Sequence, residues 1–335
     1  MFLAYLSRLV FTSMATVALT FEAVPWMREA FIKYGKTRPV AKTDSTSLLG
    51  RFARATVSKN MFAQFYAIGV IVSAALTADF SNWYQFKAQQ AMDAAPERFY
   101  FRFYMQLEYW LLGATRESFI DAPTSALLLA MGMYNLHVIL RLYETVYHQP
   151  ATKAQIHVGH YLVGLVHYVF APLGIISDAI YTPGWVPANA YLVLTGMAVF
   201  AYASIHQWRC HHILYKLRFQ SLREERERRE REAEPEAEPE AEAETSAKEA
   251  NVQTAYVVPT GDLFRYVSSP HYLCEILVYI ALWLVTSCQS TTILIMTIWS
   301  AVNLGITASE SQKWYKSTFS DKFPRNRRAL IPFVW

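Results

Sequence analysis

Long hydrophobic runs without charge alternate with shorter polar stretches along the chain. No Asp, Glu, Lys or Arg occurs in residues 60–78, 122–140 or 154–177. An α-helix needs about 20 mostly apolar residues to cross a bilayer. The pattern therefore predicts an all-α, multi-pass membrane protein with about seven transmembrane helices. They are expected at residues 1–20, 61–78, 123–147, 156–177, 189–212, 272–288 and 291–309.

The first segment could instead be a cleaved signal peptide. Its Arg8 lies inside the apolar run rather than before it, and no clear stop precedes Phe21, so we favour a membrane anchor. Lys and Arg are enriched in cytosolic loops. They predominate after the first, third and fifth segments and in the C-terminal tail, whereas residues 179–188 contain none. This alternation predicts a lumenal N-terminus and a cytosolic C-terminus.

Composition agrees with a membrane protein and excludes several other classes. Of the 335 residues, 53% are hydrophobic and 17% are charged, whereas soluble domains carry about 25% charged residues. The net charge of +4 is small and gives no indication of nucleic-acid binding. Three cysteines are too few, and odd in number, for a disulfide framework.

A charged insertion divides the chain into three predicted regions. Residues 1–218 contain five helices, residues 219–255 form the insertion, and residues 256–335 contain the last two helices. The insertion has Glu-Ala-Glu-Pro repeats and too few apolar side chains to fold alone, so it is expected to be a disordered cytosolic segment. Charge pairs in residues 223–232 favour a helical extension that Pro235 would end.

No soluble nucleotide-binding or hydrolase motif is present, so membrane helices and their loops would have to hold any cofactor. The chain has nine histidines, and imidazole is a ligand of iron in membrane oxygenases. However, the sequence contains only one His-His pair and no H-x-x-H-H box. We therefore expect no metal site.

Two polar features at the ends of predicted helices are candidates for chemistry. Glu275 is followed by a long uncharged run, and an ionisable residue at a membrane boundary needs a partner, either a facing arginine or a polar ligand. His206, Arg209, His211 and Arg218 form a basic group at the end of the fifth segment. They are interpreted either as interfacial residues or as a site for an anion such as phosphate.

Residues 259–275, PTGDLFRYVSSPHYLCE, resemble the C-terminal signature of the steroid 5-alpha-reductase family, and best its polyprenal (polyprenol) reductase branch. Three further stretches are similar to that branch: residues 206–218 (HQWRCHHILYKLR), 314–319 (WYKSTF) and 328–333 (RALIPF). The resemblance implies a seven-helix enzyme of the endoplasmic reticulum membrane. Such an enzyme uses NADPH to reduce a carbon–carbon double bond conjugated to a carbonyl.

In this branch the implied substrate is a long-chain polyprenal, which is reduced at its α-isoprene unit to dolichal. Dolichal leads to dolichol, the carrier lipid of protein N-glycosylation. The implied partners are therefore this substrate and membrane lipids, with no nucleic acid and no metal. Motif positions place a cofactor site at Gln207, His211, Arg218, His271, Glu275 and Tyr315. The resemblance implies that Arg218 meets phosphate and that Glu275 and His271 hold the nicotinamide end.

Some positions depart from the family pattern. Steroid-reducing relatives bind the substrate ketone with a glutamate in the second span, but residues 62–66 contain no carboxylate, and His137 is followed by Val138 rather than tyrosine. These differences argue against a steroid substrate. They leave His137, Tyr66 and Gln64 as candidates for the group that donates to the carbonyl. Val257 replaces a family arginine, and His271 replaces an asparagine.

Alternative functions remain open from the sequence. The chain could reduce another conjugated enone, such as a 3-oxo-steroid, or be a non-catalytic lipid-binding membrane protein of the same fold. Isoprenylcysteine methyltransferases share a Pro-x-Tyr-x-x-Glu pattern before a helical hairpin. They lack the Arg-Cys-His and terminal Leu-Ile-Pro signatures of this chain.

Overall fold

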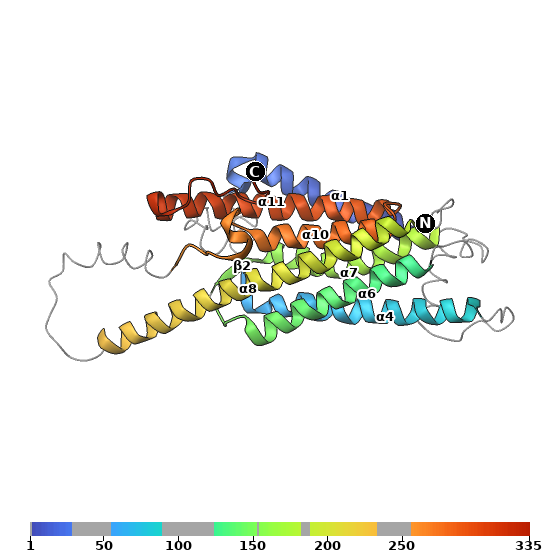
Figure 1. Cartoon of the computed structure of the whole chain (residues 1–335), viewed down its shortest axis with the longest axis horizontal. Coiled ribbons are helices and arrows are strands. Elements are labelled where there is room, and N and C mark those ends of the chain that lie inside the picture. Colours follow the sequence, from blue (N-terminus) through green and yellow to red (C-terminus); the bar gives the residue numbers. More distant parts are fainter. Residues whose placement is uncertain (1, 29–54, 89–123, 153, 182–187, 233–255) are drawn as a thin grey trace.

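A computed structural model describes residues 2–28, 55–88, 124–152, 154–181, 188–232 and 256–335. Most of them lie in helices that run along the long axis of the molecule (Figure 1). The long helices are α1 (Phe2–Ala23), α4 (Phe62–Ala88), α6 (Thr124–Tyr143), α7 (Val158–Tyr181), α8 (Ala190–Glu232), α10 (Pro270–Val285) and α11 (Thr291–Phe319). The short helical elements are α2 (Pro25–Met27), η3 (Lys59–Met61), η5 (Glu144–His148), η6 (Asp262–Arg265) and η7 (Ser320–Lys322).

Each of the seven predicted segments coincides with one of these long helices, so the predicted helical fold is confirmed. Five of them are long and apolar enough to cross a membrane: α1, α4, α6 with η5, α7 and α11. Helix α10 is equally apolar but has only 16 residues. Helix α8 has no Asp, Glu, Lys or Arg before Arg209. These helices support a multi-pass membrane protein.

A two-stranded sheet, which the sequence did not predict, connects two segments at one end of the bundle. Strand β1 (Thr56–Ser58) precedes α4 and pairs antiparallel with β2 (Gln155–His157), which precedes α7. At the same end of the bundle, Arg28 after α1 forms an ion pair with Glu310 near the end of α11. The connections after α1, after α6 and after α11 therefore lie at one end of the bundle.

A buried ion pair anchors the opposite end. Asp178 near the end of α7 accepts a 2.7 Å hydrogen bond from Arg8 of α1. The same carboxylate accepts from the hydroxyl of Ser290 at 3.0 Å and from the amide and hydroxyl of Thr292 at 2.7 and 2.6 Å. Ser290 also caps α11 by accepting from the amide of Ile293. One carboxylate thus connects the starts of α1 and α11 to the end of α7.

Helix α8 lies along α10, and their contact aligns the residues of the candidate site. A β-carbon added at Gly196 would lie 2.8 Å from the carbonyl oxygen of Ala281, so only glycine allows the two backbones to approach this closely. Beyond this contact, α8 continues to Glu232 and projects from the bundle (Figure 1). The helical extension suggested by charge pairs is confirmed, with Arg223 bound to Glu227. The rest of the predicted insertion lies outside the described residues.

Candidate functional site

Glu275 is the centre of a polar cluster between α6, α8 and α10. Its side chain is only 16% exposed. One carboxylate oxygen lies 3.2 Å from Nε2 of His137 on α6, and the other accepts a 2.6 Å hydrogen bond from the amide of Gln207 on α8. The same amide lies 3.5 Å from the backbone oxygen of His271, one turn before Glu275. The predicted partner for Glu275 is therefore found, but it is a histidine and an amide rather than an arginine.

A second cluster adjoins the first one turn further along α6. Arg141 forms a buried ion pair with Glu144, and its guanidinium lies 2.6 Å from Nδ1 of His211. That histidine nitrogen also lies 2.9 Å from the Glu144 carboxylate. On its other side, Arg141 donates a 3.1 Å hydrogen bond to the hydroxyl of Tyr66 on α4, with the guanidinium over the tyrosine ring. The cluster thus connects α4, α6 and α8.

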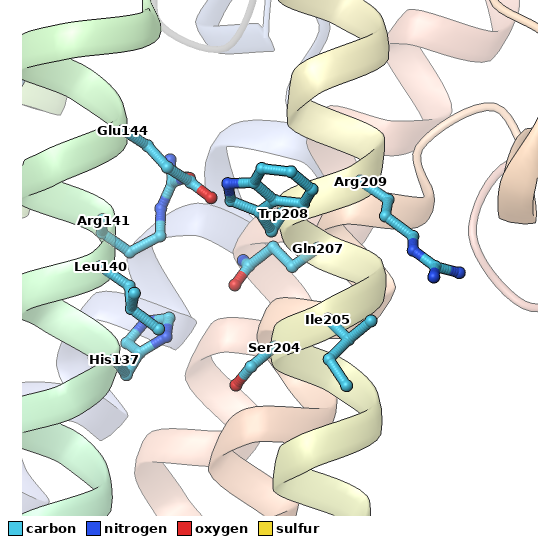
Figure 2. A pocket seen from close by; sticks show the side chains of 9 residues that line it. All are labelled: His137, Leu140, Arg141, Glu144, Ser204, Ile205, Gln207, Trp208 and Arg209. Carbon is cyan, nitrogen blue, oxygen red and sulfur yellow. The ribbon is translucent and has the colours of Figure 1, made fainter.

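A cavity of about 340 Å³ opens beside both clusters, between α6 and α8. Figure 2 shows Gln207 and Trp208 extending from α8 toward α6, whereas Arg209 points away. The side chains that line it are those of His137, Leu140, Arg141, Glu144, Ser204, Ile205, Gln207, Trp208 and Arg209. The cavity therefore combines polar groups from both clusters with apolar side chains from the two facing helices.

The helical period divides the predicted basic group between two faces of α8. Nδ1 of His206 lies 2.6 Å from the carboxylate of Asp262. The preceding residue, Gly261, has a φ of +93° and turns the chain at this point. Arg209 lies 3.8 Å from the same carboxylate. His211 faces the opposite way, toward Glu144. His206 and Arg209 therefore hold the loop before α10 against α8, although Arg209 also borders the cavity. Of these three residues, only His211 joins the two polar clusters.

The remaining predicted site residues lie at different distances from these clusters. His271 is near the first cluster, and its ring centroid is 5.4 Å from that of His211. Arg218 lies about two turns further along α8. Tyr315 stacks on Phe323 beyond α11, and Gln64 is exposed and bonds with Tyr161. The structure thus brings together His137, Gln207, His211, His271 and Glu275, with Tyr66 joined through Arg141, but not Gln64 or Tyr315.

Arg141 and Glu144 are the two members of the site that sequence reasoning did not select. Both are buried, with exposures of 8% and 3%. They are three residues apart inside the predicted third span, so their side chains lie on one face of the helix. An ionisable pair within a membrane helix is itself a signal of a functional site, and this signal was present in the sequence.

The comparisons with known proteins agree with the sequence resemblance. Residues 243–335 match the family described as 3-oxo-5-alpha-steroid 4-dehydrogenase. The chain is 28% identical to polyprenal reductase 2 of Oryza sativa subsp. japonica, covering 91% of this chain and 87% of the relative. It is 27% identical to the polyprenal reductases of Mus musculus and Homo sapiens, covering 91% of this chain and 85% of each relative.

The predicted resemblance to this family is confirmed. The family match includes Glu275, His271 and Tyr315, whereas the polar residues of α6 and α8 precede it. The similarity to the polyprenal reductases, in contrast, spans nine-tenths of the chain.

Proposed function

We propose that this protein is a membrane enzyme that uses NADPH to reduce the α-isoprene double bond of polyprenal to dolichal. The similarity to polyprenal reductases over nine-tenths of the chain supports the substrate class. The single structural observation that carries the proposal is the Gln207–Glu275–His137 cluster beside a cavity. An ionisable cluster inside an apolar bundle is costly to bury, and such clusters mark functional sites in membrane proteins.

Seven spans, with the N-terminus lumenal and the C-terminus cytosolic, are part of this proposal. The contacts at the ends of the bundle support the alternation. Connections predicted on the cytosolic side meet one another through β1 and β2 and through Arg28 and Glu310. At the other end, Asp178 meets Thr292, and the amide of Asn189 donates to the hydroxyl of Ser287. We place the enzyme in the endoplasmic reticulum, where dolichol synthesis would use it.

The residues around the clusters fit a nicotinamide cofactor. Gln207 and Glu275 together offer a donor and acceptors, which suit the carboxamide and ribose hydroxyls of the nicotinamide end. Lys59 and Arg218 lie close enough for their charges to repel, and no acidic partner of either is found among the described residues. Two such cations suit a phosphate group. The set predicted for the cofactor is therefore retained as a proposal, with Lys59 added.

A buried arginine near Tyr315 is also suited to an anion. Arg327 is only 4% exposed and donates a 2.9 Å hydrogen bond to the carbonyl oxygen of Pro259. Its Nε has no hydrogen-bond partner among the described residues. Burial lowers the pKa of the guanidinium from its usual value, because water no longer solvates the charge. A phosphate oxygen would satisfy this group, which supports a cofactor site that extends toward Tyr315.

Tyr66 is the best placed of the three candidates for the carbonyl donor. Its hydroxyl oxygen accepts from Arg141, and no acceptor for its hydrogen is found among the described residues. The hydrogen is therefore available for the carbonyl oxygen, where negative charge develops during the reduction. His137 is engaged with Glu275, and Gln64 is exposed and bonded to Tyr161. When bound, NADPH supplies the hydride that adds to the β-carbon of the enal.

The test is a reaction of purified protein with polyprenal and NADPH, with mass spectrometry of the product. A gain of two hydrogens at the α-isoprene unit is expected. Testosterone serves as the alternative enone, because the matched family is described as acting on 3-oxo-steroids. Reduction of testosterone alone would contradict the substrate class. Binding of NADPH without turnover of either substrate would favour a non-catalytic protein.

A further inference from the structure

A buried tyrosine–histidine pair adjoins the first cluster, and the proposed cofactor and carbonyl contacts do not use it. The hydroxyl of Tyr279 on α10 lies 2.8 Å from Nε2 of His167 on α7. Tyr279 is 1% exposed and His167 is 9% exposed. Nδ1 of His167 has no hydrogen-bond partner among the described residues. A phenylalanine and a leucine would fill this space without the free-energy cost of burying polar atoms. The presence of the pair therefore indicates a function.

The pair adjoins Glu275 on the same face of α10. Tyr279 follows Glu275 by four residues, and this spacing stacks two side chains one above the other along a helix. His137 touches both, because its Nε2 lies 3.2 Å from the Glu275 carboxylate and its ring meets the Tyr279 ring edge-on at 6.4 Å. The Tyr279 side chain therefore lies next to the carboxylate, on a residue whose backbone is one helical turn further into the apolar run.

This position, beside Glu275 and within the buried core, fits the second half of the proposed reaction. If Glu275 and Gln207 hold the nicotinamide end, an apolar substrate lies deeper in the membrane, beyond the carboxylate. After hydride addition at the β-carbon, the enolate must receive a proton at its α-carbon. An ionised carboxylate has no proton to give. A tyrosine, with an ordinary pKa of about 10, retains its proton at neutral pH and can protonate an enolate carbon.

We propose that Tyr279 donates the proton that completes the reduction at the α-carbon, and that His167 positions the Tyr279 hydroxyl. This inference rests on the proposed function. In the step, the O–H bond of Tyr279 breaks and a C–H bond forms at the α-carbon, while the electron pair of the enolate forms that bond and the carbonyl is restored. The resulting phenolate regains a proton from water after the product leaves.

The chain offers a matched control in Tyr134 of α6. Tyr134 is also a completely buried tyrosine in the same core. Its hydroxyl has no hydrogen-bond partner among the described residues. Removal of either hydroxyl leaves a ring of the same size, so Tyr279→Phe and Tyr134→Phe create equally small packing changes. Only the first removes a proton donor that has a partner histidine.

The experiment measures single turnovers of polyprenal with saturating NADPH, in H₂O and in D₂O, together with NADPH affinity and melting temperature. We expect Tyr279→Phe to lower the rate by about 100-fold or more, to leave NADPH affinity unchanged and to alter the solvent isotope effect. We expect Tyr134→Phe to react like the unaltered protein. Equal rates for the two variants, with an active parent protein, would overturn the inference and leave the proposed function standing.

His167 provides a second variant in case Tyr279→Phe does not fold. Glutamine at this position has an amide nitrogen near the place of Nε2 and can contact the Tyr279 hydroxyl, whereas phenylalanine cannot. We expect His167→Phe to lower kcat by about tenfold with little change in KM, and His167→Gln to restore most of the rate. Equal rates for these two variants would contradict the positioning role. An inactive parent protein would instead contradict the proposed function itself.

Discussion

Gln207 of α8 donates a 2.6 Å hydrogen bond to the carboxylate of Glu275 of α10. The two residues are 68 positions apart in the chain, and the charged insertion lies between them. Their contact connects the long helix that precedes the insertion to the signature that follows it. It also provides a direct test of the cofactor site, because each residue is proposed to contact the nicotinamide end.

Replacing Gln207 with leucine should weaken NADPH binding by about tenfold. The change removes one hydrogen bond to a charged group, worth about 1.5–3 kcal/mol, and part of that loss is offset because the cofactor can reorganise. The measurement is fluorescence titration of NADPH with purified protein. Ser204→Ala is the control, since Ser204 lines the same cavity but its hydroxyl has no partner among the described residues. Unchanged affinity in Gln207→Leu would argue against this cofactor position.

Replacing Arg218 with glutamine should also weaken NADPH binding, by about 10-fold to 100-fold, through loss of a charged contact to phosphate. Arg223→Gln is the matched control, because Arg223 lies on the same helix, is exposed and pairs only with Glu227 among the described residues. NADH is titrated in parallel, and an effect confined to NADPH would assign Arg218 to the 2′-phosphate. Equal affinities for both arginine variants would remove Arg218 from the proposed site.

Replacing Gly196 with alanine should lower the free energy of unfolding by about 1–3 kcal/mol, because the new methyl group meets the backbone of α10. The displaced α8 should also weaken NADPH binding through Gln207. Gly132→Ala is the control, because its added β-carbon meets no atom of a neighbouring element within 4 Å. Alanine there should be neutral or stabilising, since alanine favours helix over glycine by about 1 kcal/mol. Thermal unfolding in detergent compares the two variants.

Replacing Asp178 with asparagine should destabilise the protein without changing NADPH affinity. Asp178 is 1% exposed and pairs with Arg8 at the end of the bundle away from the site. We expect a loss of about 2–3 kcal/mol, less than for a fully buried pair, because the Arg8 side chain is 25% exposed. Melting temperature and cofactor titration are measured on the same sample. A loss of affinity at full stability would show that the two ends are coupled.

The sequence predicted the helices well because their signal is local. A mostly apolar run of about 20 residues can be identified from the sequence alone, and each of the seven predicted runs lies in a helix of the structure. The order and spacing of His206, Arg209 and His211 did not predict which of them enters the site. Which of these residues enters the site depends on the orientation of α8 against α10. The close contact at Gly196 fixes that orientation, and it cannot be identified from one stretch of sequence.

Site residues that belong to a sequence motif were predicted, and those that come together only through helix packing were missed. Glu275 was named from the signature at residues 259–275 and Gln207 from the stretch at residues 206–218, and the structure brings the two together. Arg141 and Glu144 were not named, although an ion pair within a span was visible in the sequence. Tyr279 and His167 are 112 residues apart in the chain, and only the packing of their helices shows that they meet.

The measurement that tests the central claim most directly compares the parent protein with Glu275→Gln in the polyprenal and NADPH assay. Glutamine keeps the size of Glu275 but removes the charge that meets His137 and the cofactor site. The account predicts that the parent gives dolichal, that the variant loses at least about 100-fold in kcat/KM, about 2.7 kcal/mol, and that it binds NADPH more weakly. Equal turnover of polyprenal by both proteins would contradict the proposed role of Glu275, and no turnover by the parent would contradict the proposed reaction.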